Sequence, residues 1–185
     1  MTQLTLAKPE HFKQLVKLVA DFHAEGGITQ TDAAREAAIM PLLEGSPHGA
    51  IYLAGPSKAP VGYVVLTFGW SLEMGGMDGF VDEIYIRPGV RGRGIGTEIL
   101  TSLPAQLAGF GLKAVHLEVD RDKPDVQRLY QKMGFEARDR HVLMTRALCN
   151  LLENASRPQH RHPPPGTPYG LSSPRPLLTP AATPI

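Results

Sequence analysis

Apolar side chains recur every three or four residues near the start of the chain, and this spacing predicts an amphipathic helix. Pro9 can occupy the first turn of that helix, and the pair Gly26 and Gly27 ends it. Thr31 or Asp32 can cap a second helix, whose apolar pattern stops before a Gly-Ser-Pro break. The apolar positions that define the helices are Phe12, Leu15, Val16, Val19 and Phe22 in the first, and Ile39, Leu42 and Leu43 in the second.

Segments rich in β-branched and aromatic residues lie between glycine and proline turns, which predicts strands. The run from Val61 to Phe68 is almost wholly apolar and favours a central strand. Three glycines between Ser71 and Gly79 predict a loop. We therefore expect strands over 2–7, 50–54, 61–68, 80–86, 114–119 and 140–148.

Two further helices are expected over 95–109 and 124–133, the second ended by Gly134. Pro104 lies in the middle of the first. It removes a hydrogen bond and clashes with the carbonyl of Leu100, so a kink or an early break is expected there.

The order of these elements implies an α/β fold with one mixed sheet and helices on both of its faces. We expect the domain to occupy 1–150, which is long enough to bury about 70% of its unfolded surface. Nine of the 17 prolines lie after residue 157. The segment 151–185 is therefore expected to be a disordered, Pro-rich tail, with a ligand for a proline-binding module as the alternative.

Composition excludes several classes of protein. The net charge is +1, so no strong field favours nucleic acid or a membrane surface. Cys149 is the only cysteine, which rules out a disulfide scaffold. No apolar run reaches about 18 residues, so we expect a cytoplasmic protein without a membrane span. His160 and His162 lie in the tail without preset geometry, and we expect no metal site.

A glycine-rich turn lies between a predicted strand and a predicted helix, with the sequence Arg91-Gly92-Arg93-Gly94-Ile95-Gly96-Thr97. The first N–H groups of a helix have no internal acceptor and carry a partial positive charge. Glycines let a phosphate approach these groups closely. The Walker lysine is missing, and the glycine spacing does not fit the dinucleotide pattern. Phosphate binding is favoured, with a simple tight turn as the alternative.

The pattern R/Q-x-x-G-x-G/A is met by Arg91, Gly94 and Gly96, after the strand Val81-Asp82-Glu83-Ile84-Tyr85-Ile86-Arg87-Pro88. About 30 residues further on comes Gln127-Arg128-Leu129-Tyr130-Gln131-Lys132-Met133-Gly134-Phe135. Together these motifs resemble the GCN5-related N-acetyltransferase (GNAT) superfamily, over about 1–148. The resemblance implies a mostly antiparallel mixed sheet with two splayed strands. It also implies acetyl transfer from acetyl-CoA to an amine.

The resemblance further implies how the cosubstrate acetyl-CoA is held. The pyrophosphate would bind backbone N–H groups of the turn, and the pantetheine arm would lie along the preceding strand. Lys123 stands where the family usually has an asparagine that contacts this arm. The residues concerned are Val90, Arg91, Gly92, Arg93, Gly94, Ile95, Gly96 and Thr97 for the pyrophosphate, Ile84, Tyr85 and Ile86 for the arm and the thioester carbonyl, and Lys123.

The chemistry requires a base and an acid. An alkyl amine has a pKa of about 10.4 and must lose a proton before it attacks a thioester. Glu83 matches the strand position of the base in some members. Asp82 is expected on the opposite face, because side chains alternate along a strand. Tyr130 matches the family's general acid, which protonates the leaving thiolate. The alternatives are a loop cap or an arginine pair for Glu83 and a core position for Tyr130.

The acceptor remains open between a small molecule and a protein amine. We expect it to enter beside the first two helices and the 70–79 loop, where His23, Glu25, Trp70 and Glu73 are candidate lining residues. Glu25, Glu73 and Glu83 would then make an acidic mouth that suits a cationic amine. The main alternative is a non-catalytic acyl-CoA-binding or regulatory domain of the same fold. A nucleotide-phosphate-binding protein of another fold lacks its key residues, and a homodimer stays open.

Overall fold

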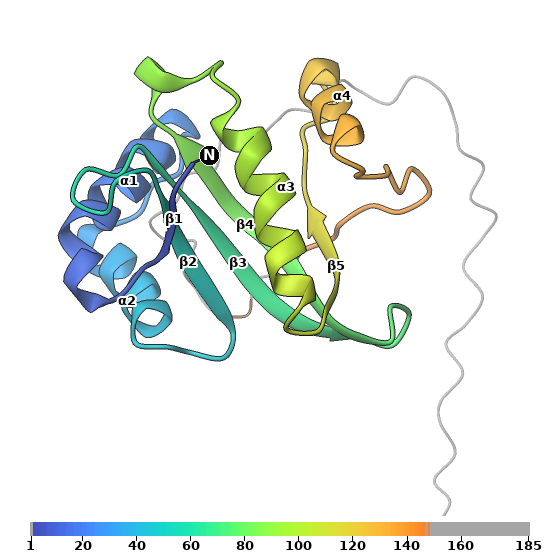
Figure 1. Cartoon of the computed structure of the whole chain (residues 1–185), viewed down its shortest axis with the longest axis horizontal. Helices are drawn as coiled ribbons and strands as arrows, with labels where there is room; N and C mark the ends of the chain where they lie inside the picture. The colour runs from blue at the N-terminus through green and yellow to red at the C-terminus, as the bar shows by residue number, and fades with distance from the viewer. Residues whose placement is uncertain (1, 147, 149–185) are drawn as a thin grey trace, which may run out of the picture.

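The computed structural model describes residues 2–146 and 148. Five strands form one sheet in the order in which they occur along the chain (Figure 1). Neighbouring strands are antiparallel from β1 to β4, and β4 pairs with β5 in parallel. This confirms the mixed, mostly antiparallel sheet. The strands are β1 (Leu4–Leu6), β2 (Gly49–Ala54), β3 (Gly62–Ser71), β4 (Gly76–Ile86) and β5 (Leu112–Leu117).

Helices cover both faces of the sheet, as expected. A short 3-10 turn, η1 (Pro9–His11), leads into α1 (Phe12–Glu25), and α1 packs with α2 (Asp32–Leu43) on one face. The Thr31 hydroxyl accepts a hydrogen bond from the Ala34 N–H and caps α2. A second 3-10 turn, η2 (Pro88–Val90), precedes α3 (Ile95–Ala108), which crosses the other face, while α4 (Pro124–Lys132) lies beside the end of β5 (Figure 1).

Three sequence expectations about the elements are wrong. The segment 71–79 is not a loop, because β3 and β4 stay paired as far as Ser71 and Gly76 and form a hairpin. The helix is not broken at Pro104, since α3 runs through it. Packing of the buried Leu100 and Leu103 offsets a proline penalty of about 3 kcal/mol. The last expected strand, 140–148, is absent from its described residues, 140–146 and 148. The expected tail, 151–185, lies outside the described residues.

The pairing of β3 with β4 contains a bulge. Val65 lies opposite Glu83 and Leu66 lies opposite Val81, so the intervening Asp82 has no partner on β3. A bulge interrupts the alternation of side chains along a strand. Val81 belongs to the core under α3, whereas Glu83 faces the α1 side, where the side chains of Tyr63 and Tyr85 are buried.

The other edge of β4 separates from β5 at the same point. The parallel register ends with Val81 opposite Leu117, yet β4 continues to Ile86. Beyond Val81, the backbone N–H and C=O groups of β4 that do not pair with β3 therefore face an opening rather than a strand. The bulge against β3 and the separation from β5 thus both occur at Asp82, and the candidate site lies at this point of β4.

Candidate active site

A cavity of about 320 Å³ lies where β4 and β5 separate. The two predicted catalytic residues, Glu83 and Tyr130, both line it, although they come from β4 and α4. Lys123, at the N-cap of α4, lines the same cavity. The complete lining consists of Phe22, Val81, Asp82, Glu83, Ile84, Leu117, Glu118, Val119, Asp120, Lys123, Val126 and Tyr130.

From the alternation of side chains along the strand, only one of Asp82 and Glu83 should face the cleft, and that expectation is wrong. Both residues line the cavity, because the bulge at Asp82 disrupts the alternation. Partial desolvation, and then the charge of Glu83, raises the pKa of Asp82 above its ordinary value. Asp82 is the more exposed of the two side chains.

Glu83 is held by two partners from different elements. The Nε2 atom of His23, on α1, lies 2.7 Å from Oε1 of Glu83. The hydroxyl of Tyr63, on β3, donates to Oε2 at 2.6 Å. Burial, followed by the charge of Glu83, raises the pKa of Tyr63 far above its ordinary value, so this phenol keeps its proton and acts as the donor. Each carboxylate oxygen thus has one fixed contact, which leaves further lone pairs for a substrate.

Tyr130 lies on α4 and is half-buried. Its ring packs against Phe135 in an edge-on arrangement, with the ring centroids 5.9 Å apart. Burial raises the pKa of Tyr130, so its hydroxyl carries a proton throughout the neutral range. A protonated hydroxyl at the cavity wall can donate a proton or a hydrogen bond to a group inside.

The glycine-rich turn has the backbone that an anion site requires. Gly92 and Gly94 adopt positive φ angles of 75° and 79°, and Gly94 is the N-cap of α3. The N–H groups of Ile95, Gly96 and Thr97 start the helix and have no acceptor within it. A Cβ added at any of these three glycines would meet no atom within 4 Å, so the backbone is open to an approaching group. The turn therefore fits a phosphate or pyrophosphate.

The side chain of Arg91 is engaged by residues next to the turn and on α1. Its Nε donates to the carbonyl oxygen of Ile86, and its Nη2 donates to Oε2 of Glu25, both at 2.7 Å. The guanidinium also lies 5.4 Å from the centre of the Tyr85 ring. The side chain of Arg91 thus braces the turn against α1, and its backbone N–H donates to the carbonyl oxygen of Pro88 at 3.2 Å.

The residues expected at an acidic acceptor mouth do not gather there as free carboxylates. Glu25 pairs with Arg91, and Glu73 pairs with Arg138 at 2.6 Å. Trp70 is 75% exposed on β3, and His23 is buried against Glu83. The acidic residues that do line the cavity, besides Glu83, are Asp82, Glu118 and Asp120.

Sequence reasoning missed Tyr63, Glu118 and Asp120. Tyr63 lies in a nearly unbroken apolar run, and the only signal was a polar hydroxyl that must find a partner when buried. Glu118 and Asp120 follow the last paired residue of β5. Their place at the cavity depends on where the two strands separate, which the sequence does not mark.

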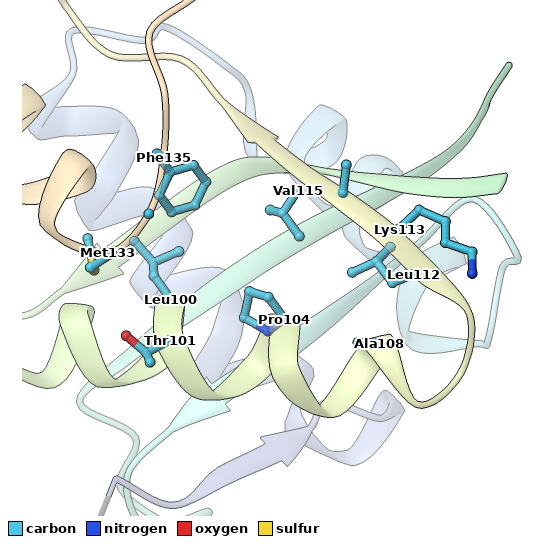
Figure 2. A pocket seen from close by; sticks show the side chains of 11 residues that line it. Leu100, Thr101, Pro104, Ala108, Leu112, Lys113, Val115, Met133 and Phe135 are labelled. Atoms are coloured by element: carbon cyan, nitrogen blue, oxygen red, sulfur yellow. The ribbon is translucent and has the colours of Figure 1, made fainter. Parts of the chain in front are cut away.

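A second groove lies between α3 and β5, and Figure 2 shows the ring of Pro104 projecting into it below Val115. Its walls are mainly apolar and include Leu112 and Phe135. None of the predicted catalytic or cosubstrate residues lines it. Among the described residues there is no group of three or more His, Cys, Asp or Glu side chains that could hold a metal ion. The described helices are also too short or too polar to cross a membrane.

Comparison with known proteins gives a consistent result. Residues 13–135 match the acetyltransferase (GNAT) family. An acetyltransferase of Pectobacterium atrosepticum is 35% identical over 69 residues, which cover 36% of this chain and 49% of that protein. An acetyltransferase of Sodalis glossinidius is 32% identical over 78 residues, which cover 40% of this chain and 55% of that protein. The chain thus spans about half the length of these curated relatives.

Solved structures share the fold. An integron cassette protein from a salt-marsh metagenome superposes with a TM-score of 0.69 at 32% identity, covering 80% of this chain and 91% of that one. An aminoglycoside N-acetyltransferase in complex with CoA superposes with a TM-score of 0.65 at 16% identity, covering 80% of this chain and 96% of that one. The second likeness concerns the fold alone.

Proposed function

Because this chain belongs to the acetyltransferase (GNAT) family, we propose that it transfers an acetyl group from acetyl-CoA to a primary amine by direct attack on the thioester. One observation carries the proposal. A carboxylate, Glu83, and a protonated phenol, Tyr130, line one cavity at the point where β4 and β5 separate. The acceptor is a small molecule or a protein.

The cosubstrate fits the opening and the turn that follows the same strand. The backbone N–H groups over 92–97 bind the pyrophosphate, for which the open glycine backbone leaves room. The unpaired edge of β4 at Ile84, Tyr85 and Ile86 hydrogen-bonds the amides of the pantetheine arm. Lys123 contacts this arm from the start of α4. The similar aminoglycoside enzyme was crystallised with CoA, which supports this assignment.

Acetyl-CoA supplies the activated acyl group, and the side chains of the cavity move the protons. Glu83 removes the proton of the acceptor's ammonium group, directly or through a water molecule, and so generates the nucleophilic amine. The hydroxyl of Tyr130 gives its proton to the departing thiolate, because a free thiol has a pKa of about 8.5 and is therefore mostly protonated at neutral pH.

The test is isothermal titration of the full chain with acetyl-CoA, with ATP as a control, followed by thiol-release assays across a panel of amines. The proposal expects binding of acetyl-CoA but not of ATP, and release of CoA that depends on the amine. Binding without release for any amine would favour the non-catalytic acyl-CoA-binding alternative. Absence of binding would exclude acetyl-CoA as the cosubstrate.

A further inference from the structure

Glu83 is held by His23 and Tyr63, two contacts that a proton-accepting carboxylate does not itself require. His23 is only 7% exposed, although it is a polar residue on an amphipathic helix. Its imidazole lies beside Phe22, whose ring in turn packs against Tyr63 and Tyr85 with centroid distances of 6.4 and 6.0 Å. Burying a polar side chain among aromatic rings is costly unless its polar atoms are bonded. The contact with Glu83 provides that bond for only one of the two ring nitrogens.

The second ring nitrogen of His23, Nδ1, indicates which ring atoms carry a proton. Among the described residues, the buried Nδ1 of His23 has no hydrogen-bond partner. A charged imidazolium would place an N–H group there without an acceptor, which costs more than leaving a lone pair unbonded. The neutral tautomer that carries its proton on Nε2 satisfies the geometry, with Nε2–H donating to Oε1 of Glu83. His23 and Tyr63 then both donate to one ionised carboxylate.

We infer that His23 and Tyr63 are positioning residues that hold the Glu83 carboxylate at a fixed orientation toward the cavity; this rests on the proposed role of Glu83 as base. The two donors come from α1, which covers one face of the sheet, and from β3, which pairs with the edge of β4 opposite β5. The three groups together carry one negative charge. The lone pairs of Glu83 that remain unbonded are therefore the acceptors for the proton of the amine.

The molecule contains a matched pair for comparison. His116, on β5, lies 3.5 Å from Asp78, on β4, but both side chains are about a quarter to a third exposed, at 32% and 23%. Neither residue lines the cavity. A His–carboxylate pair in this position has no reacting group to orient. Substitutions at His116 therefore serve as a control for the general effect of removing such a pair.

The kinetic test uses four variants of the full chain. His23→Leu removes the donor, whereas His23→Gln places an amide N–H near the position of Nε2. We expect kcat to fall about 10-fold or more in His23→Leu and in Tyr63→Phe, since each loses a hydrogen bond to a charged group. His23→Gln should stay within about threefold of the parent protein, with the KM for acetyl-CoA unchanged in all variants. His116→Leu, which removes the control pair with Asp78, should behave as the parent does.

A purely structural role for His23 would lower thermal stability without this pattern of rescue by glutamine. Equal kcat values in His23→Leu, His23→Gln and the parent would overturn the inference. Should His23→Leu fail to fold, Tyr63→Phe, which loses only one oxygen atom, decides the matter, because an unchanged kcat in that variant would also overturn it.

A second measurement does not depend on activity. Nitrogen NMR of the full chain with labelled histidine distinguishes the two ring tautomers, and the signal of His23 is assigned by its loss in His23→Gln. We expect a neutral ring with the proton on Nε2. A ring protonated on Nδ1 would overturn the network even in an active enzyme. Conversely, the expected spectrum in a protein that acetylates no amine would leave the network standing and remove the proposed function.

Discussion

The half of the molecule that holds Glu83 is packed very differently from the half that holds Tyr130. The first half, from β1 through β4, contains the buried cluster of α1, α2 and the sheet, and Leu15 and Leu18 are fully inaccessible there. From Lys113 onward no described residue is buried, and α4 contributes none. The proposed base, Glu83, is thus held by the core, whereas the proposed acid, Tyr130, lies on a lightly packed helix. One wall of the cavity is therefore backed by the buried cluster of α1, α2 and the sheet, whereas the wall formed by α4 contains no buried residue.

The largest expected effect tests this difference in packing. Leu18→Ala should lower the free energy of unfolding by about 2–5 kcal/mol, because it leaves a cavity in the α1 cluster. Leu129→Ala, on the exposed side of α4, should change it by about 0.5 kcal/mol or less. Urea denaturation followed by circular dichroism measures both. Similar losses in the two variants would show that the halves are equally packed.

The next effect concerns the lightly packed wall. Tyr130→Phe should lower kcat about 100-fold, the usual magnitude for losing a general acid, with a smaller change in the KM for acetyl-CoA. Stability should hardly change, since only the hydroxyl is lost. Tyr52→Phe is the matched control, because this tyrosine lies on β2 outside the cavity. Unchanged turnover in Tyr130→Phe would remove the acid role.

Two alanine substitutions in the glycine-rich turn, each with a smaller expected effect, distinguish backbone strain from contact with the ligand. Gly94→Ala places a side chain at a φ of 79° and should cost about 1–2 kcal/mol of stability. Gly96→Ala lies in the first turn of α3, where alanine is favourable, and should not lower stability. Both variants should weaken acetyl-CoA binding in calorimetric titration. Parent-like affinity in both would show that the ligand does not approach this backbone.

The smallest expected effect is a pH dependence of the melting temperature that originates at Asp82, the bulge residue. The pKa of Asp82 is raised in the folded protein, so its ionised form is less stable there than in the unfolded chain. Any stability from this group is present below the ordinary pKa of about 3.8–3.9 and is lost as the pH rises through the folded value. Asp82→Asn should therefore raise the melting temperature at pH 7, and the gain should vanish near pH 3. A gain that persists in acid would contradict this origin.

The sequence predicted much of the fold because its signals are local. The helical spacing from Phe12 to Phe22 and the apolar run from Val61 to Phe68 each indicate an element without reference to the rest of the chain. The glycine-rich turn was equally readable, since positive φ angles at Gly92 and Gly94 require that residue type. Placing Glu83 and Tyr130 in one cavity needed the family resemblance in addition.

What could not be predicted depends on contacts between distant residues. The bulge at Asp82 follows from the register of β4 against β3, and no residue type within 80–86 predicts it. The contacts of Glu83 with His23 and Tyr63 span 60 and 20 residues. The pairing of Glu25 with Arg91 spans 66 residues. Such pairs are set by tertiary packing, so the sequence alone did not predict that Glu25 and Glu73 each pair with an arginine.

The central claim is that Glu83 is the base, held at the cavity by the packed half of the molecule. The most direct measurement compares Glu83→Gln with Asp82→Asn in thiol-release kinetics with saturating acetyl-CoA, after titration has shown that both variants bind it as the parent does. We predict that Glu83→Gln loses about 100-fold or more in kcat, while Asp82→Asn stays within about 10-fold of the parent. A larger loss in Asp82→Asn than in Glu83→Gln would contradict the account and assign the proton transfer to the bulge residue.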